Sequence, residues 1–446
     1  MGSVSLYSTL LDLQSLNASA IYNSDNRDDY KALVCIMLRG GNDAFNTIIP
    51  RDSKGYNEYK QARSNLAIPQ NEIIPLYPVS YNQQELGFHP SLPELAELFA
   101  NNKLSVVCNV GTLVQATSRA DYINGQNLPS GLFSHSDQSH HWQTSLPQSN
   151  SPTGWGGRLA DLVYSANSNQ QISMNISLAG KNVFQLGNQV AEYSIRPIGN
   201  GSVGIKGYGG NSTFDQLRTS LVNNLMEKQY QDIFKQSYAD VVMGSQNAHE
   251  LFSGAISQST LNTTFSDTAL SDSLRMVSRT IAVRESLGMK RQTFYVQLDG
   301  WDHHDDLIYY HERLLQELSR SLYEFQMALE ELEVDDYVTT FTISDFGRTL
   351  TSNGNGSDHA WGSNMLVMGK QVNGREVYGN YPSLSLNNPL IVDDAVIIPQ
   401  MSTDEYFAEL ALWYGVAKSD LVQIFPNIGN FYDVFSDHAP VGFMKI

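Results

Sequence analysis

Five short runs of apolar residues recur along the chain, separated by longer polar or amphipathic segments. They occupy residues 32–38, 104–110, 293–298, 337–343 and 364–368. Their residues are mostly β-branched, aromatic or otherwise apolar, which predicts buried β-strands. The fourth run reads Tyr-Val-Thr-Thr-Phe-Thr-Ile and passes directly into polar residues. We therefore expect these runs to form the middle of a sheet, with polar side chains at the strand ends.

The segments between these runs carry the spacing of helices. The longest, residues 307–332, repeats apolar positions three or four residues apart, so one face of the predicted helix is apolar. These positions are Leu314, Leu315, Leu318, Leu322, Phe325, Leu329 and Leu332. Residues 214–289 are predicted to be mostly helical, with an interruption near 253–268. Shorter helices are predicted over 91–100 and near 403–416.

The order of these elements predicts the fold class. Strands that alternate with helices pair mainly in parallel, because each connecting helix packs on a face of the sheet. We therefore expect an α/β fold with a central, mainly parallel β-sheet sandwiched by helices. Residues 171–213 mix short alternating runs with many Gly and Asn, which favours a small β-rich insertion. No linker or internal repeat divides residues 30–446, which are predicted to form a single domain.

Charge narrows the classes of partner. The 446 residues include 28 Lys and Arg against 46 Asp and Glu, a formal net charge of -18. Binding to nucleic acid needs a basic surface, so no nucleic-acid partner is expected. A small anionic substrate is still compatible with this net charge, because a metal ion or a nearby arginine can make the electrostatic potential of one site positive. No apolar stretch is long enough for a transmembrane segment.

The two cysteines, Cys35 and Cys108, each lie inside a predicted strand. Free Cys behaves as a small core residue, so both are expected to be buried thiols. A disulfide would need the two strands to be neighbours with suitable geometry, which the sequence leaves open. Two cysteines are too few for a disulfide scaffold or a thiolate zinc site.

Residues 1–29 are interpreted as a leader. Ala18-Ser19-Ala20 matches the small-x-small pattern of a signal-peptidase site and follows a mildly apolar stretch, but a basic segment before that stretch is missing. One interpretation is an export signal whose beginning, with any twin-arginine motif, lies upstream of the printed Met1. The other is an ordinary N-terminal helix or leader. We expect export, and hence a periplasmic or extracellular protein.

Acidic and imidazole side chains follow three of the predicted strands. Asp43 follows the first, Asp302 and His304 follow the third, and Asp345 follows the fourth, with His359 fourteen residues on. Strands in α/β proteins present their chemistry at their carboxyl ends, so these side chains are expected to lie together. Carboxylate and imidazole are ligands for divalent metals. The sequence therefore predicts a metal site at this edge of the sheet.

Each of these residues also has a structural interpretation. Asp43 stands in a Gly-Gly-Asn-Asp turn and suits an Asx turn or a helix cap. Asp302 suits the acidic start of a helix, and His303 or Asp305 is an alternative ligand beside it. Arg348 offers a planar fork of donors for phosphate or sulfate oxygens, or forms a structural ion pair. His359 is a ligand or a core histidine with a hydrogen-bonded partner.

A serine and a histidine, Ser134 and His135, precede a short polar stretch that suits a helix start. A serine there is a routine helix cap. It is also where a nucleophile would deliver an anion to free backbone N–H groups. No Walker loop, Gly-x-Ser-x-Gly elbow or dinucleotide fingerprint occurs in the sequence.

Six motifs in a fixed order carry a family resemblance. They are Leu-Arg-Gly-Gly-Asn-Asp-Ala-Phe-Asn-Thr at 38–47, Gly-Phe-His-Pro-Ser-Leu at 87–92, Ser-His-Ser-Asp-Gln at 134–138, Gly-Trp-Gly-Gly-Arg at 154–158, Trp-Asp-His-His at 301–304, and Ser-Asp-Phe-Gly-Arg-Thr with a later Asp-His at 344–359. Together they resemble the bacterial domain of unknown function 1501 family. The resemblance covers about residues 30–440. That family is placed in the alkaline-phosphatase-like superfamily and usually carries a twin-arginine export signal.

The resemblance implies a fold, a cofactor and a reaction. It implies a central mixed sheet between helices, and a Ser or Thr (or formylglycine) nucleophile that attacks a phosphate or sulfate ester. It implies a divalent metal, with zinc, calcium and manganese as candidates. The residues similar to the metal ligands of the superfamily are Asp43, Asp302, His304, Asp345 and His359. Ser134 is the candidate for the nucleophile position, and Thr112, just beyond the second strand, is the alternative.

Several positions depart from the superfamily pattern. Phe346 follows Asp345, where many superfamily phosphatases have an Asp-His pair, and Asp302 and His304 are closer than the usual four-residue spacing. Asp345 replaces the family's usual Glu before Phe-Gly-Arg, and Ala360 replaces a glycine. A Cys- or Ser-x-Pro-x-Arg motif for formylglycine is absent. These departures weaken the case for a two-zinc phosphatase or a conventional sulfatase and are compatible with a one-metal or altered site.

Two functions fit these observations. The first is an exported, metal-dependent hydrolase of phosphate or sulfate esters, in which Ser134 attacks and Arg348 or the metal neutralises charge on the equatorial oxygens. The alternative is a secreted or cell-surface binding protein on a hydrolase-like scaffold, whose partner is a glycan or another exported protein. We expect the enzyme, because the carboxylates and histidines of the site occur together.

Overall fold

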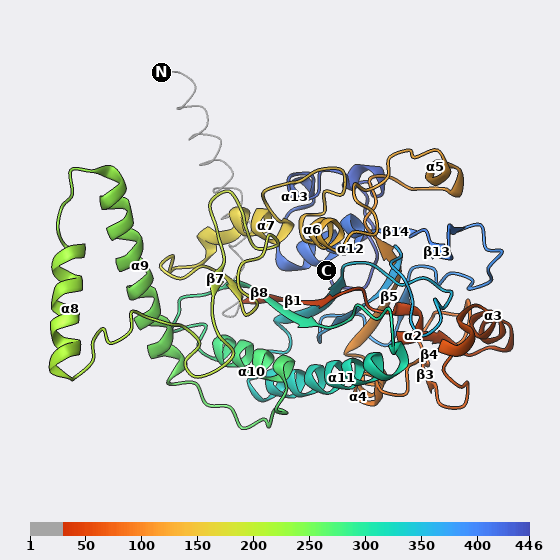
Figure 1. The fold of residues 1–446 in the computed structure, drawn as a ribbon, viewed down its shortest axis with the longest axis horizontal. Helices are drawn as coiled ribbons and strands as arrows, with labels where there is room; N and C mark the ends of the chain where they lie inside the picture. Colours follow the sequence, from red (N-terminus) through yellow and green to blue (C-terminus); the bar gives the residue numbers. More distant parts are fainter. Residues whose placement is uncertain (1–29) are drawn as a thin grey trace, which may run out of the picture.

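A central β-sheet runs through the computed structural model, which describes residues 30–446 (Figure 1). The predicted leader, residues 1–29, lies outside the described residues. The strands follow the order β11-β5-β10-β9-β1-β8-β6-β7, and β14 pairs with β5. Their bounds are β1 Lys31–Arg39, β5 Leu104–Gly111, β6 Asn175–Ser177, β7 Tyr193–Ser194, β8 Arg291–Asp299, β9 Val338–Ser344, β10 Ser363–Met368, β11 Val377–Tyr378 and β14 Met401–Ser402.

Most strand pairs of this sheet are parallel. β1 lies between β8 and β9 and is parallel to both, so that Leu38 is level with Leu298 and Ser344. β10 is antiparallel to its neighbours β9 and β5, and the other pairs are parallel. The predicted α/β class with a mainly parallel sheet is confirmed. The five predicted strands lie within one or two residues of their expected bounds, because their apolar runs are buried on both faces.

Helices cover both faces of the sheet. In Figure 1, α4, α10 and α11 lie on one side, and α6, α7, α12 and α13 lie on the other. The helix bounds are α2 Ala44–Thr47, α3 Ser53–Arg63, α4 Pro93–Ala100, α5 Arg119–Ile123, α6 His135–Thr144, α7 Trp155–Val163, α8 Thr213–Met226, α9 Ile233–Ile256, α10 Ala269–Ala282, α11 Leu307–Glu331, α12 Thr403–Tyr414 and α13 Leu421–Ile424. α11 buries Leu315, Leu322 and Phe325, members of its predicted apolar face.

Two smaller sheets flank the main one. Their strands are β2 Ile48–Pro50, β3 Ile74–Pro75 and β4 Leu86–Phe88 in one, and β12 Ile391–Val392 and β13 Val396–Ile397 in the other. The expected insertion at 171–213 contributes β6 and β7, which extend the edge of the main sheet beside β8.

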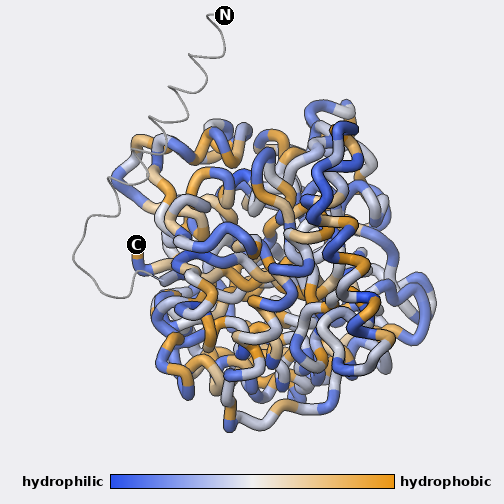
Figure 2. Tube along the Cα trace, turned by 90° about the vertical axis from the view of Figure 1, so that its left-hand side faces the viewer, coloured by the Kyte–Doolittle hydropathy of each residue, from blue (hydrophilic) through white to orange (hydrophobic). Residues whose placement is uncertain are grey.

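The helices α8 and α9 extend away from the sheet as a hairpin on the left of Figure 1. Figure 2 looks at the molecule from that side, where hydrophobic and hydrophilic stretches alternate along the chain. A break at 257–268 separates α9 from α10, as the sequence predicted. Among the described residues, none of the helices is both long and apolar enough to cross a membrane.

Both cysteines are buried free thiols. Cys35 lies on β1 and Cys108 on β5, and the strands β9 and β10 separate them. Burial raises the pKa of both thiols well above the ordinary value. The predicted core role of the two cysteines is confirmed.

Candidate metal centre

Three loops meet where β1, β8 and β9 end side by side. β1 leads into Gly40-Gly41, β8 into Trp301-Asp302, and β9 into Asp345. A Cβ on Gly40 would lie 2.5 Å from the backbone nitrogen of Asp302, and Gly40 has a φ of +122° that favours glycine. The N–H of Gly40 donates to Asp345 Oδ2 at 3.1 Å. Glycine at this position therefore lets the three strand ends close on one point.

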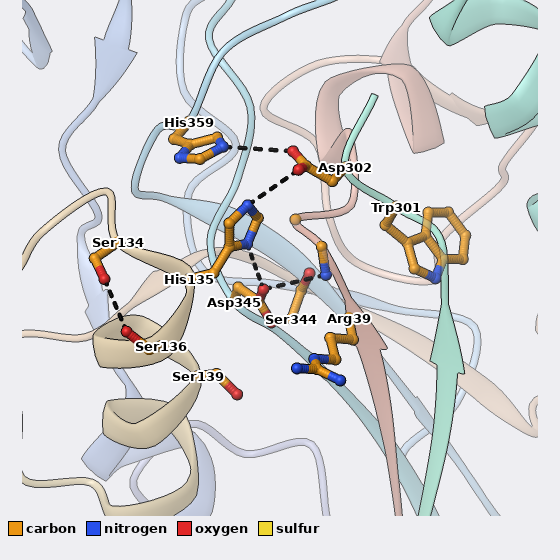
Figure 3. Close-up of polar contacts among 12 residues, drawn as sticks. Arg39, Ser134, His135, Ser136, Ser139, Trp301, Asp302, Ser344, Asp345 and His359 are labelled. Atoms are coloured by element: carbon orange, nitrogen blue, oxygen red, sulfur yellow. Dashed lines mark hydrogen bonds and ion pairs between the residues drawn. The ribbon is translucent and has the colours of Figure 1, made fainter. Parts of the chain in front are cut away.

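Helix α6 delivers a histidine to this point. His135 is the first residue of α6, and Figure 3 shows its ring directed towards Asp302 and Asp345. His135 Nδ1 lies 2.7 Å from Oδ2 of Asp345, a carboxylate that is only 1% exposed. This hydrogen bond raises the pKa of His135, although burial opposes the shift. The buried carboxylate thus fixes the ring and turns Nε2 towards Asp302.

A second histidine, His359, approaches from the loop that follows β9. Its Nδ1 lies 2.7 Å from the backbone oxygen of Phe133. A carbonyl can only accept, so Nδ1 carries the proton and Nε2 keeps its lone pair. Phe133 has a φ of 78°, a strained conformation for an aromatic residue, at the point where its carbonyl meets the ring. Burial lowers the pKa of His359, which favours the neutral imidazole.

The third histidine, His304, lies at the open side of the cluster. Its Nδ1 is 2.9 Å from Oδ1 of Asp358, and its Nε2 is 2.9 Å from Nε2 of His359. Its neighbour His303, the alternative ligand in the sequence, is buried instead and stacks on Tyr310. His304 therefore lies at the cluster and His303 does not, and the predicted role of His304 as a metal ligand stays a prediction.

The three rings converge on the carboxylate of Asp302. Its oxygens lie 3.3 Å from Nε2 of His135, 3.1 Å from that of His304 and 3.4 Å from that of His359. Burial alone would raise the pKa of Asp302, but the hydrogen bond and charge of Arg348, at 2.5 Å, hold that pKa below its ordinary value. The centre of the cluster is therefore an ionised carboxylate.

This arrangement has the features of a metal site. Nδ1 of each histidine faces an oxygen acceptor, and such hydrogen bonds orient the rings of metal-ligating histidines. Nε2 of His135 is buried without a hydrogen bond, and ligand atoms of His135, Asp302 and His359 all lie within 4.8 Å of one another. Two imidazoles and a carboxylate suit zinc and other first-row divalent ions better than calcium, which prefers oxygen ligands.

Asp43, the first residue of the predicted ligand set, has a different partner. Its carboxylate forms an ion pair with Arg63 of α3, and both side chains are almost completely buried. Arg63 also donates to the backbone oxygen of Thr349 at 2.8 Å. Burial raises the pKa of Asp43, although the charges of Arg63 and Arg348 oppose the shift. The pairing favours a structural role for Asp43, and its role as a metal ligand stays a prediction.

Asp345 and Arg348 support the cluster from beneath. Asp345 accepts hydrogen bonds at one oxygen from His135 and from the N–H of Gly40, and its role as a metal ligand stays a prediction. The guanidinium of Arg348 is fully buried and donates to the backbone oxygens of Gly41 and Ser357, each at 2.9 Å, as well as to Asp302. This is the ion-pair interpretation of Arg348. It holds the strand ends and the carboxylate in place and does not face solvent.

Neither candidate nucleophile points into the cluster. Ser134 Oγ caps α6, accepting from the N–H of Asp137 at 3.5 Å, and contacts Ser136 Oγ at 3.1 Å; Figure 3 shows it on the far side of His135 from Asp302. Thr112 is fully buried, and its hydroxyl donates to Gln138 at 2.7 Å. The attack by either hydroxyl stays a prediction.

His135 is the residue whose role sequence reasoning did not assign. The Ser134-His135 motif drew attention to the hydroxyl, but the helix start turns the imidazole towards the strand ends. The sequence does place His135 directly after a serine that suits a helix cap, and therefore at the first position of the helix. Sequence alone does not say which of the two side chains faces the sheet.

Comparisons with known proteins give a family and a set of distant structures. A family model described as "Protein of unknown function (DUF1501)" matches residues 30–404. No curated protein matches the chain. The family resemblance expected from the six motifs is confirmed by this match.

Solved structures with similar chain traces include a sulfatase and a lipoteichoic acid synthase. Ps i-CgsB, in complex with k-i-k-neocarrahexaose, is 13% identical with a TM-score of 0.34, over 92% of this chain and 78% of that one. PsFucS1 sulfatase from Pseudoalteromonas sp. is 9% identical with a TM-score of 0.35, over 92% and 72%. LtaP from Listeria monocytogenes is 7% identical with a TM-score of 0.33, over 86% and 80%. TM-scores this low show only a distant likeness of chain trace.

Proposed function

The chain belongs to the DUF1501 family, and from this premise and the geometry of the site we propose that it is a divalent-metal-dependent hydrolase of phosphate or sulfate esters. One observation carries the proposal. Nε2 of His135 and Nε2 of His359 converge on the carboxylate of Asp302, while the Nδ1 atom of each of these two rings is already engaged by an oxygen. Two imidazole nitrogens and a carboxylate directed at one point form a donor set for a divalent cation.

His135, Asp302 and His359 would hold the cation, which leaves a coordination position for substrate. When bound, a divalent ion supplies Lewis-acid chemistry by polarising the ester oxygens. Zinc and manganese suit these donors. Asp345 and Arg348 act as positioning residues, because each fixes a ligand from a buried place.

We assign proton transfer to His304, at the open side of the site. Its ring is held by Asp358, and Nε2 takes a proton from the water that attacks phosphorus or sulfur. The bond to the ester oxygen breaks, and that oxygen takes the proton as it leaves. Water is assigned this attack because Ser134 is engaged as a helix cap and Thr112 is buried.

The test is hydrolysis of 4-nitrophenyl phosphate and 4-nitrophenyl sulfate by the purified protein, loaded in turn with zinc and manganese. We expect turnover with at least one metal and none after chelation. His304→Gln should lower kcat by about 10²–10⁴-fold with the metal content unchanged. Loss of metal from that variant would instead place His304 among the ligands, as the sequence predicted. Unchanged turnover in His135→Ala would contradict the proposal.

A second candidate is a metal-containing binding protein without turnover. It is favoured by one observation: the two hydroxyls that resemble nucleophile positions are engaged elsewhere. Its partner would be a glycan or another exported protein. Binding of a sulfated glycan by a metal-loaded protein that hydrolyses none of a broad ester panel would support this candidate over the hydrolase.

Export is part of the proposal and rests on Ala18-Ser19-Ala20 alone. It places the protein in the periplasm or outside the cell. Mass spectrometry of the protein made in its own cells tests this: a mature chain that begins at residue 21 supports export. An intact residue 1–29 segment in a cytosolic fraction contradicts it.

A further inference from the structure

A polar cavity of about 480 Å³ lies beside the candidate metal centre and shares His135 with it. One face of α6, the end of β1, two residues of β8 and the segment 179–183 form its walls. Its lining residues are Arg39, His135, Ser136, Ser139, His140, Gln143, Ala179, Lys181, Asn182, Val183, Tyr295 and Gln297. The hydroxyl, amide and imidazole groups among them are hydrogen-bonding partners for a hydrated ligand.

The charge of this cavity is opposite to that of the chain. Arg39 and Lys181 line it, and no Asp or Glu is among its described lining residues, although the chain carries a net charge of -18. The nearest carboxylate partner of Arg39 is Asp299, at 3.7 Å and largely exposed, so the guanidinium is held only weakly. In Figure 3, Arg39 and Ser139 approach the same region below His135 from β1 and α6. These observations point to an anionic ligand.

We propose that this cavity is an anion subsite for a sugar that carries more than one sulfate or phosphate group. One ester group would meet the metal centre, and Arg39 and Lys181 would bind another on the same molecule. Among the neutral lining groups, the hydroxyl of Ser139 and the amide of Gln297 suit the hydroxyls of a sugar ring. This inference deepens the proposed function and rests on it for the reaction, but the anion binding is measurable without turnover.

The experiment is calorimetric titration of the metal-loaded protein with glucose 6-sulfate, glucose 6-phosphate, inorganic sulfate and glucose. Arg39→Gln and Lys181→Gln change exposed side chains, so neither threatens the core. We expect both anionic sugars to bind, glucose not to bind, and each substitution to weaken binding about tenfold. Lys235→Gln, an exposed lysine on α9, is the matched control and should bind as the wild type does.

Several results separate this inference from the proposed function. If both variants bind the anionic sugars more weakly than the wild type and the wild type shows no turnover, the subsite is supported and the proposed hydrolase activity is contradicted. Turnover of 4-nitrophenyl esters without binding of either anionic sugar overturns the subsite alone. Equal binding by wild type and the Arg39→Gln, Lys181→Gln double variant also overturns it. If inorganic sulfate binds as tightly as glucose 6-sulfate, the sugar contributes nothing to the affinity, which contradicts the proposed sugar subsite.

A second inference concerns the α8–α9 hairpin, whose apolar side chains face solvent. None of the residues of α8 is buried, and its exposed positions Phe214, Leu217, Leu221 and Leu225 follow a spacing of three and four along one side. α9 adds a second set of residues that are more than half exposed: Ile233, Phe234, Tyr238 and Val241. A soluble helix normally turns such a stripe inwards.

We infer that this hairpin pairs with the hairpin of a second copy of the chain. Eight large apolar side chains, each more than half exposed, offer roughly 800 Å² per copy, which is the size of a stable interface. Residues 213–241 hold three basic and four acidic residues, a net charge of -1, so two strongly acidic chains repel least here. So few basic residues do not suit a helix that binds an anionic membrane surface.

Light scattering after size-exclusion chromatography tests this pairing over a range of concentrations. We expect a dimer in the wild type and a monomer in Leu217→Glu, Leu221→Glu, both at exposed positions. Val79→Glu, exposed at 71% elsewhere, is the control and should stay dimeric. A wild type that is monomeric throughout, or a Leu217→Glu, Leu221→Glu variant that remains dimeric, overturns the inference. Binding of a monomer to lipid vesicles would replace the second copy with a membrane surface.

Discussion

Asp43→Asn separates a structural role for this carboxylate from the metal role that its position in the sequence suggests. The carboxylate and Arg63 are 1% and 0% exposed in their side chains, so the substitution leaves a guanidinium buried without its counter-charge. Removing one partner of a buried ion pair costs about 3–5 kcal/mol of unfolding free energy. Arg63 also holds Thr349, in the loop that leads to the site, so this cost includes loosening of that loop.

Urea denaturation followed by circular dichroism measures the loss, and metal titration of the folded variant measures the affinity. We expect the stability to fall by about 3–5 kcal/mol while the metal affinity stays within about twofold. Asp299→Asn is the matched control, because its pair with Arg39 is exposed and worth at most about 1 kcal/mol. A variant as stable as the wild type that binds metal tenfold more weakly would refute this reasoning and make Asp43 a ligand.

Three further predictions concern the core and the site. Burial raises the pKa of Asp404 from 3.8 to about 7, so the folded state keeps a proton that the unfolded state releases, and stability falls as pH rises through this range. Urea titrations should show Asp404→Asn gaining about 3 kcal/mol on the wild type between pH 5 and pH 8; a constant difference would contradict this. Trp155→Ala should cost about 3–5 kcal/mol in the same assay, because the ring is fully buried and stacks on Phe407 at 4.5 Å, and a loss below about 1 kcal/mol would be inconsistent with that packing. Asp345→Asn should weaken zinc binding by about 10–100-fold, measured by competition with a chelating dye, because it removes the charge that orients His135; unchanged affinity would argue against that support.

The strands of the central sheet were predictable because their signal is local. Burial on both faces selects continuous apolar runs, and residues 337–343 and 104–110 carry that signal without help from the rest of the chain. α6 was harder to predict, because all of its residues except Trp142 are polar and its burial comes from packing against β9 and α7. Tertiary contacts, and not an apolar stripe, define this helix.

The part of the site that could be predicted is the part whose residues follow the strands. Asp302, His304 and His359 lie together as expected, since parallel strands bring their carboxyl ends to one edge. The pairing of Asp43 with Arg63 depends on how α3 packs, and the contact between His135 and Asp345 joins residues 210 positions apart. In both pairs, the sequence around one residue contains no pattern that identifies the other residue.

Elemental analysis by plasma mass spectrometry of the purified protein, after incubation with zinc and with manganese, tests the central claim most directly. We expect close to one metal ion per chain, lost from His135→Ala and from His359→Ala but retained by Ser134→Ala. A protein that holds no metal under either condition, or a His135→Ala variant that keeps its metal in full, would contradict the metal centre described here.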